Sequence, residues 1–251
     1  MNVVMAELDL QEAIDKIYTA CRTCYNPGKP EDMYKEIKDK EHEVGKDELI
    51  MPLENEKKVK LIKQVLRSSH FSTVEHQTIT FFISGLSRAA AQQLTRHRIG
   101  CNYSMQSQRY VTFEDGKFEH VTPPKINNNP EALSTFNKAM EDASTYYNAL
   151  ISLGIPAEDA RAVLPNACST NITFTVNLRE LIHICNERLC TCAQLEIRQL
   201  TQQMARKVIA KLPFMEEFLV PKCGMLGYCN EPKFRTCGRK PLKATFFNKD
   251  K

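Results

Sequence analysis

The chain has 251 residues, of which 42% are hydrophobic and 25% charged, so its composition excludes a disordered or fibrous protein and favours one large or two small globular domains. The formal net charge is only +4 and acidic residues accompany the lysine-rich stretches, which argues against a continuous basic surface for nucleic acid. No apolar run could span a bilayer and no signal-peptide pattern is visible, so we expect a cytoplasmic protein without a membrane partner.

The first half of the chain predicts a charged insertion, a strand and a helix. Residues 26–58 are dense in both charge signs and indicate a solvated insertion with some helix. Residues 78–84, TITFFIS, are rich in β-branched and aromatic side chains, as is typical of a strand. After Gly85, the sequence LSRAAAQQLTRHR contains strong helix formers, so we expect a helix with the motif of residues 95–110 beginning at its C-terminal end.

The second half is mainly helical by pattern. We expect a helix over 131–153, bounded by proline and glycine, and a short helix over 157–164. A second strand is predicted at 171–177, followed by a long helical pattern over 178–212. Because the segments do not alternate as regular βαβ units, the prediction is an α+β (α/β) protein with an antiparallel sheet packed on long helices.

Glycine spacing excludes two common nucleotide-binding motifs. No two of the nine glycines are spaced as GxG, so neither a Rossmann fingerprint nor a P-loop is present. A nucleotide cofactor would therefore have to be held by side chains.

The most informative motif is TRHRIGCNYSMQSQRY at residues 95–110, where Arg96, His97 and Arg98 are followed by Arg109. Arginine binds phosphate through two parallel hydrogen bonds and stays charged at any relevant pH. A simpler alternative is that the first three residues only stabilise a helix C-terminus, worth about 0.3–1 kcal/mol per charge. That alternative does not explain the following run of hydroxyls and carboxamides, which can close over a ligand.

The motif resembles the signature of flavin-dependent thymidylate synthases, in which Arg-His-Arg and a serine are separated by seven or eight residues. Here eight residues lie between Arg98 and Ser107. Three other segments, at 70–76, 87–98 and 160–200, resemble the family in order and separation, and the resemblance covers roughly residues 1–220. We therefore divide the chain into a catalytic domain, 1–220, containing the insertion, and a cysteine-bearing C-terminal extension, 221–251.

Two positions depart from the family pattern. Phe71 stands where an acid is usual, and Met105 stands where the family often has Gln or Glu, with the carboxamide at Gln106 instead. Whether Met105 or Gln106 approaches the ligands is left open by the sequence.

The resemblance implies an enzyme that makes thymidylate from deoxyuridine monophosphate. Methylenetetrahydrofolate would supply the carbon, and NADPH would supply reducing equivalents through FAD. The family fold has no Rossmann motif, which agrees with the missing GxG. The resemblance also implies a homotetramer with sites built from several chains.

The resemblance assigns a set of side chains to each ligand. FAD would contact Ser72, Glu75, Arg96, His97, Arg98, Asn177, Arg179 and His183. The nucleotide substrate would contact Gln93, Arg96, Gln106, Ser107, Gln108, Arg109, Arg161 and Arg188. Arg188 would also be catalytic, because a fixed guanidinium at the uracil edge stabilises negative charge that develops there.

Helical spacing gives partial support that does not depend on the resemblance. Arg179 and His183 lie at i and i+4, on one helix face. Arg188 lies nine residues after Arg179, about 180° around a straight helix, which fits ligand sites at a subunit interface.

His70 and His76 are, taken alone, more typical of structural histidines. Ser107 has no recognisable base partner, so we assign it to binding rather than nucleophilic attack.

The remaining alternatives concern the cysteines and nucleic acid. Cys223, Cys229 and Cys237 could hold a metal only if a fourth ligand came from elsewhere, so we assign no metal site. The rival function is an RNA-binding module that uses the Arg-rich cluster together with Tyr103 and Tyr110.

Overall fold

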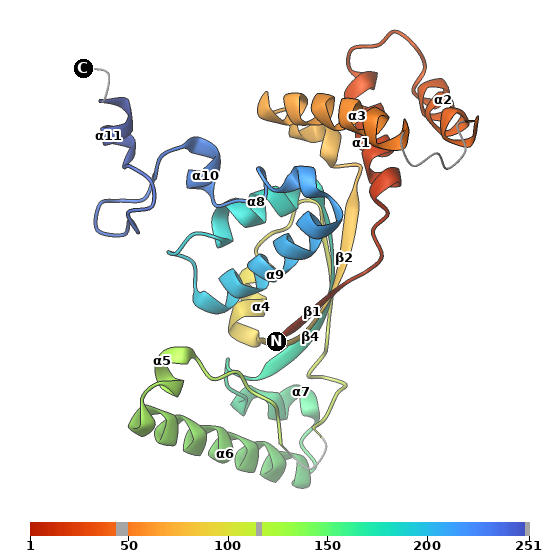
Figure 1. Ribbon diagram of the computed structural model, residues 1–251. Coiled ribbons are helices and arrows are strands. Elements are labelled where there is room, and N and C mark those ends of the chain that lie inside the picture. Colours follow the sequence, from red (N-terminus) through yellow and green to blue (C-terminus); the bar gives the residue numbers. More distant parts are fainter. Residues whose placement is uncertain (44–49, 114–116, 249–251) are drawn as a thin grey trace. The chain divides into compact units, whose positions relative to one another are not determined.

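The computed structural model describes residues 1–43, 50–113 and 117–248, with side chains outside 40–54 (Figure 1). Residues 44–49 of the predicted insertion and 249–251 of the predicted extension therefore lie outside the described part. The chain divides into two compact units. The first unit comprises Met1–Val4, Phe81–His97 and Tyr103–Phe174, and the second comprises Met5–Thr80, Arg98–Asn102 and Thr175–Lys251.

The strands form an antiparallel sheet in the order β1-β2-β4-β3. Their bounds are β1 Asn2–Met5, β2 Thr78–Ser87, β3 Cys101–Met105 and β4 Ser169–Asn177. The predicted strands correspond to β2 and β4, which confirms the α+β class. β1 and β3 were not predicted because they are short, and β3 lies within the polar part of the motif. Alternate residues of β4 are buried, which gives this strand one core-facing side.

Helices account for most of the remaining chain. They are α1 Leu10–Thr23, α2 Pro30–Glu43, α3 Ile50–Arg67, α4 Arg88–Leu94, α5 Pro124–Asn127, α6 Pro130–Ser152, α7 Ala157–Ala160, α8 Leu178–Arg188, α9 Leu195–Lys211, α10 Lys222–Leu226 and α11 Lys243–Phe247. Short 3-10 turns are η1 Phe71–Val74, η3 Arg161–Val163 and η4 Pro213–Met215. Among the helices described, none has both the length and the apolar character needed to cross a bilayer.

In the first unit, α6 packs against α5, α7 and η3. A small core of Phe118, Met140 and Cys168 lies beneath these elements. α4 begins where β2 ends, because the Ser87 hydroxyl accepts a hydrogen bond from the Ala90 N–H at 3.1 Å and caps the helix. The residues of the predicted helix at 157–164 instead form α7 and then η3.

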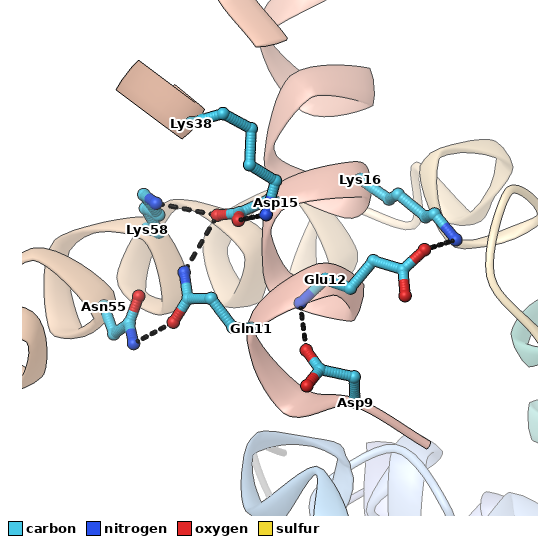
Figure 2. Close-up of polar contacts among 8 residues, drawn as sticks. All are labelled: Asp9, Gln11, Glu12, Asp15, Lys16, Lys38, Asn55 and Lys58. Carbon is cyan, nitrogen blue, oxygen red and sulfur yellow. Dashed lines mark hydrogen bonds and ion pairs between the residues drawn. The ribbon is translucent and has the colours of Figure 1, made fainter. Parts of the chain in front are cut away.

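In the second unit, α1 packs against both α2 and α3. Figure 2 shows the polar cluster that joins them: Asp15 accepts hydrogen bonds from Lys58 at 2.7 Å, Lys38 at 3.0 Å and Gln11 at 3.0 Å. Asp15 is 0% exposed, so its charge is compensated by these partners. The expectation of a merely solvated insertion is therefore wrong for Lys38 and Lys58, because both take part in this packing.

The long helical pattern predicted over 178–212 is two helices, not one. α8 ends at Arg188 and α9 begins at Leu195, and the two helices pack against each other. The intervening segment contains Cys190, Thr191 and Cys192, residue types of modest helix propensity, which explains why the pattern breaks there.

Candidate active site

The motif of residues 95–110 begins where α4 ends, at Leu94. The Tyr103 hydroxyl donates to the carbonyls of Leu94 at 3.0 Å and His97 at 2.7 Å. The Tyr103 ring stacks on Phe174 with a centroid distance of 4.9 Å. His97 is buried, whereas Arg96 is exposed. Tyr103 is thus engaged in packing, which removes one of the two stacking residues of the RNA-binding alternative.

Two predicted phosphate ligands meet at one glutamate. Arg109 Nε donates to Glu158 Oε2 at 2.8 Å, and Arg161 Nε donates to the Glu158 backbone carbonyl at 2.9 Å. The Arg109 side chain is 50% exposed and that of Glu158 is 46% exposed, so both groups can reach a ligand from solvent. The Ser107 hydroxyl accepts a hydrogen bond from the backbone N–H of Arg109 at 3.2 Å.

The residues around Ser107 face two different hollows. Met105 and Gln108 line a hollow of about 290 Å³, together with Gln92 of α4. Gln106 lines another hollow, and its carboxamide accepts a hydrogen bond from Asn171 at 3.3 Å. Met105 therefore lines the same hollow as Gln108, whereas Gln106 lines the other one. The predicted Gln93 is not among the residues that line the Gln108 hollow, whereas its neighbour Gln92 is.

Arg88 is a cation of this region that the sequence did not reveal. It is the first residue of α4, lines the same hollow as Gln108, and donates from Nη2 to the Gln106 carbonyl at 2.7 Å. Burial lowers its pKa, the Cys168 thiol raises it, and the Arg161 guanidinium lowers it again. Within the described residues, its buried Nε has no hydrogen-bond partner. The sequence feature that could have identified Arg88 is its position at a predicted strand-to-helix junction, eight residues before Arg96.

In the second unit, Asn177 connects the motif to α8. Its side-chain Oδ1 accepts from the Glu180 N–H at 2.8 Å and caps the helix, and its backbone N–H donates to the Gly100 carbonyl at 2.9 Å. Gly100 has φ +67°, and a Cβ built on it would lie 2.3 Å from Asn177 Nδ2. Only glycine fits at this position, two residues after the exposed Arg98.

The first turns of α8 carry the other predicted flavin ligands. Arg179 forms an ion pair with Glu75, so two predicted ligands that are distant in sequence are brought together. His183 is exposed one turn later. Burial raises the pKa of Glu180, and His183 and then Arg179 lower it. This face of the helix is therefore rich in groups that can bind an anion.

Ser72 and His76 line a hollow of about 460 Å³ beside α1 and α2. His70 lies outside it, and its Nδ1 is 3.2 Å from the Tyr25 hydroxyl, as expected of a structural histidine. Arg188 is the last residue of α8 and is half-buried. Oε1 of the preceding residue, Glu187, lies 4.0 Å from Lys222 Nζ.

Comparison with known proteins identifies the same family that the motif of residues 95–110 resembles. The sequence model of the family described as "Thymidylate synthase complementing protein" matches residues 8–214. A flavin-dependent thymidylate synthase of Nitratidesulfovibrio vulgaris is 39% identical over 240 residues, covering 92% of each chain. The enzyme of that name from Geobacter sulfurreducens is 43% identical over 196 residues, covering 78% of this chain and 83% of its own. The one from Clostridium tetani is 35% identical over 239 residues, covering 89% and 88%.

Proposed function

Because the chain belongs to the family of flavin-dependent thymidylate synthases, we propose that it converts deoxyuridine monophosphate to thymidylate. Methylenetetrahydrofolate is the carbon donor, and NADPH reduces the substrate through FAD. The observation that carries the proposal within this chain is the meeting of Arg109 and Arg161 at Glu158, beside Ser107.

The nucleotide phosphate would bind at these two arginines. Two guanidinium groups meet the charge of a phosphate with directional hydrogen bonds, and the Ser107 hydroxyl adds another donor. Arg88 lines a separate hollow with Gln108, and its buried Nε has no hydrogen-bond partner among the described residues. Gln93, Arg96, Gln106 and Gln108 remain assigned to the substrate by resemblance, with Gln108 rather than Gln106 in the hollow that Arg88 lines.

The second unit offers a donor set that fits a dinucleotide. Arg98 and Arg179 are exposed cations suited to a pyrophosphate, and the Ser72 hydroxyl and Asn177 carboxamide are suited to its polar edges. Glu75 would orient Arg179 through their ion pair. Arg96, His97 and His183 remain assigned to FAD by resemblance. FAD, when bound, would carry reducing equivalents from NADPH.

Arg188 would act on the uracil ring rather than on the phosphate. Its guanidinium would bind the polar edge of the ring and stabilise negative charge that develops there during the reaction. The phosphate carries the same charge in the ground and transition states, so Arg109 and Arg161 would contribute mainly to binding.

We infer that the assembly is a homotetramer with ligands held by more than one subunit. Support comes from Arg179 and Arg188, which lie nine residues apart on α8 and so point to opposite sides of the helix.

A cytoplasmic location is also proposed. All ten cysteines are free, as is typical of a reducing compartment.

The test is thymidylate formation by the purified flavoprotein. Arg188→Ala should lower turnover about 100-fold at saturating nucleotide, the size of effect seen when one electrostatic donor is removed. Arg161→Ala should mainly raise the Michaelis constant for the nucleotide. Both variants should keep flavin reduction by NADPH near the unmodified rate. Arg206→Ala is the matched control, because Arg206 is an exposed arginine on α9 to which no ligand is assigned.

Two outcomes would contradict the proposal. Unchanged turnover in Arg188→Ala would remove its catalytic role, and absence of thymidylate from the unmodified flavoprotein would overturn the activity. For the assembly, light scattering should show a tetramer. A monomer that retains stoichiometric FAD and full activity would refute the interface sites.

A further inference from the structure

Five cysteines from two separate parts of the chain gather near the end of α8. Cys190 and Cys192 lie in the segment between α8 and α9, and Cys223, Cys229 and Cys237 lie in the C-terminal region. The proposed thymidylate chemistry uses none of them. Their proximity is a property of the fold, since 31 residues or more separate the two groups in sequence.

Four of the five surround one small cavity. A volume of about 70 Å³ is lined by Cys190, Cys223, Cys229 and Cys237, with Lys222 and Arg235 also at its wall. Four cysteines that line one cavity of atomic size supply the ligand type of a tetrahedral four-cysteine metal site.

The ligand atoms of Cys190, Cys192 and Glu231 lie within 4.8 Å of one another, and among the described residues no three of the four sulfurs that line the cavity lie that close together. Sulfurs bound to one tetrahedral Zn²⁺ at about 2.3 Å lie about 3.8 Å apart, so the four cysteines must move closer together to bind one ion. Cys192 is not among the residues that line the cavity, and its Sγ donates a hydrogen bond to the Arg235 carbonyl at 3.3 Å.

Hydrogen bonds from neighbouring groups orient the sulfurs. The Thr236 hydroxyl donates to Cys229 Sγ at 3.5 Å. The backbone of Cys229 is also fixed, because its N–H donates to the Pro241 carbonyl at 2.7 Å and its carbonyl accepts from the Lys243 N–H at 3.0 Å. Such supporting bonds are typical around metal ligands, since they set the direction of the ligand atom.

The C-terminal region needs such a cross-link because it has little core of its own. Between α10 and α11, Cys229 is the buried residue, whereas the large side chain of Phe234 is 87% exposed. Short segments with few buried apolar groups are commonly held by a structural metal or by disulfides. Disulfides would leave one of the five cysteines unpaired.

We propose that Cys190, Cys223, Cys229 and Cys237 bind one structural Zn²⁺ that fastens the C-terminal region to the end of α8. Each thiol that binds loses its proton to solvent, so four thiolates and Zn²⁺ give a site of charge −2. Lys222 and Arg235 at the cavity wall offset part of that charge, whereas Glu187 and Glu231 at the same wall add to it. This inference does not depend on the proposed catalytic activity.

The experiment measures metal and flavin together on the purified full chain. We expect about one zinc per chain by elemental analysis, with release of that zinc when the thiols are titrated with a mercurial. Cys229→Ser and Cys223→Ser should lose most of the zinc. Cys192→Ser and Cys24→Ser should keep it, and Cys24 is the matched control because it is an exposed cysteine far from the cluster in sequence.

A second measurement keeps the proposal testable if the serine variants fail to fold. The unmodified chain, purified from Co²⁺-supplemented medium, should show the visible absorption of tetrahedral cobalt–thiolate. Absence of stoichiometric metal from the unmodified chain would overturn the proposal. Iron with cluster absorption, a disulfide among the four cysteines, or zinc retained by both serine variants would also overturn it.

Discussion

Replacing Gly100 by alanine tests whether the motif and α8 are coupled through one contact. Gly100 has φ +67°, and an added Cβ would lie 2.3 Å from Asn177 Nδ2 and 2.7 Å from its Cγ. Real Cβ contacts are not that short, so the Asn177 side chain must move. That movement breaks the hydrogen bond from the Glu180 N–H to Asn177 Oδ1, which caps α8.

The expected cost has two parts. A left-handed backbone costs a non-glycine residue about 1–2 kcal/mol. Losing the N-cap of α8 adds about 1 kcal/mol. Gly154→Ala isolates the first part, because Gly154 has φ +80° and its added Cβ would meet nothing within 4 Å. We therefore expect Gly100→Ala to lower the free energy of unfolding by about 2–3 kcal/mol, roughly 1 kcal/mol more than Gly154→Ala.

Urea denaturation and flavin content together decide the result. Gly100→Ala should lose bound flavin, because Asn177 and Arg179 shift when the start of α8 is disturbed, whereas Gly154→Ala should retain it. Equal destabilisation in the two variants would refute the role assigned to the Asn177 contact. Retention of full flavin content in Gly100→Ala would refute the link between that contact and the cofactor.

Four other substitutions test three separate parts of the structure. Asp15→Asn should lower the free energy of unfolding by about 3 kcal/mol, because it leaves the Lys58 ammonium, whose side chain is 11% exposed, without its anion. Lys38→Met should cost less than about 1 kcal/mol, since that side chain is 35% exposed, and equal losses would contradict the cluster. Tyr103→Phe should cost about 1–2 kcal/mol in thermal unfolding, and no change would mean that its hydroxyl contacts are not stabilising. Ser107→Ala should raise the Michaelis constant for the nucleotide while some turnover remains, and a substrate adduct trapped on Ser107 would overturn its binding role.

The local pattern predicted the elements whose physical cause is local. β-branched and aromatic residues over 78–84 and 171–177 correspond to β2 and β4, and helix formers before the motif correspond to α4. β3 was missed because Cys101–Met105 is short and lies inside the motif, and because its pairing with β4 depends on a distant part of the chain. The break after Arg188 was also missed, because the hydrophobic pattern continues into the next helix.

The family was predictable because its signature lies within one sequence motif. The order and spacing of the Arg-His-Arg triplet and Ser107 were enough to identify the family. The contacts of Glu158 were not, because 49 residues separate it from Arg109 and no local pattern marks its role. Arg88 was missed for a related reason, since its isolated Nε is a property of burial, which the sequence does not display.

The exposure of Glu158 has a consequence for how a phosphate would enter. Its carboxylate holds Arg109 at 2.8 Å in an ion pair whose members are 50% and 46% exposed. A pair of this kind is worth only about 0–1 kcal/mol, because water already solvates both charges. A phosphate could therefore displace the carboxylate at little cost and gain charge-assisted hydrogen bonds from Arg109 and Arg161. A buried carboxylate at the same position would bind Arg109 more strongly and would repel the phosphate. The half-exposed ion pair thus holds Arg109 next to Glu158, whose backbone carbonyl accepts from Arg161, and a phosphate that bound there would compete only with a weak contact.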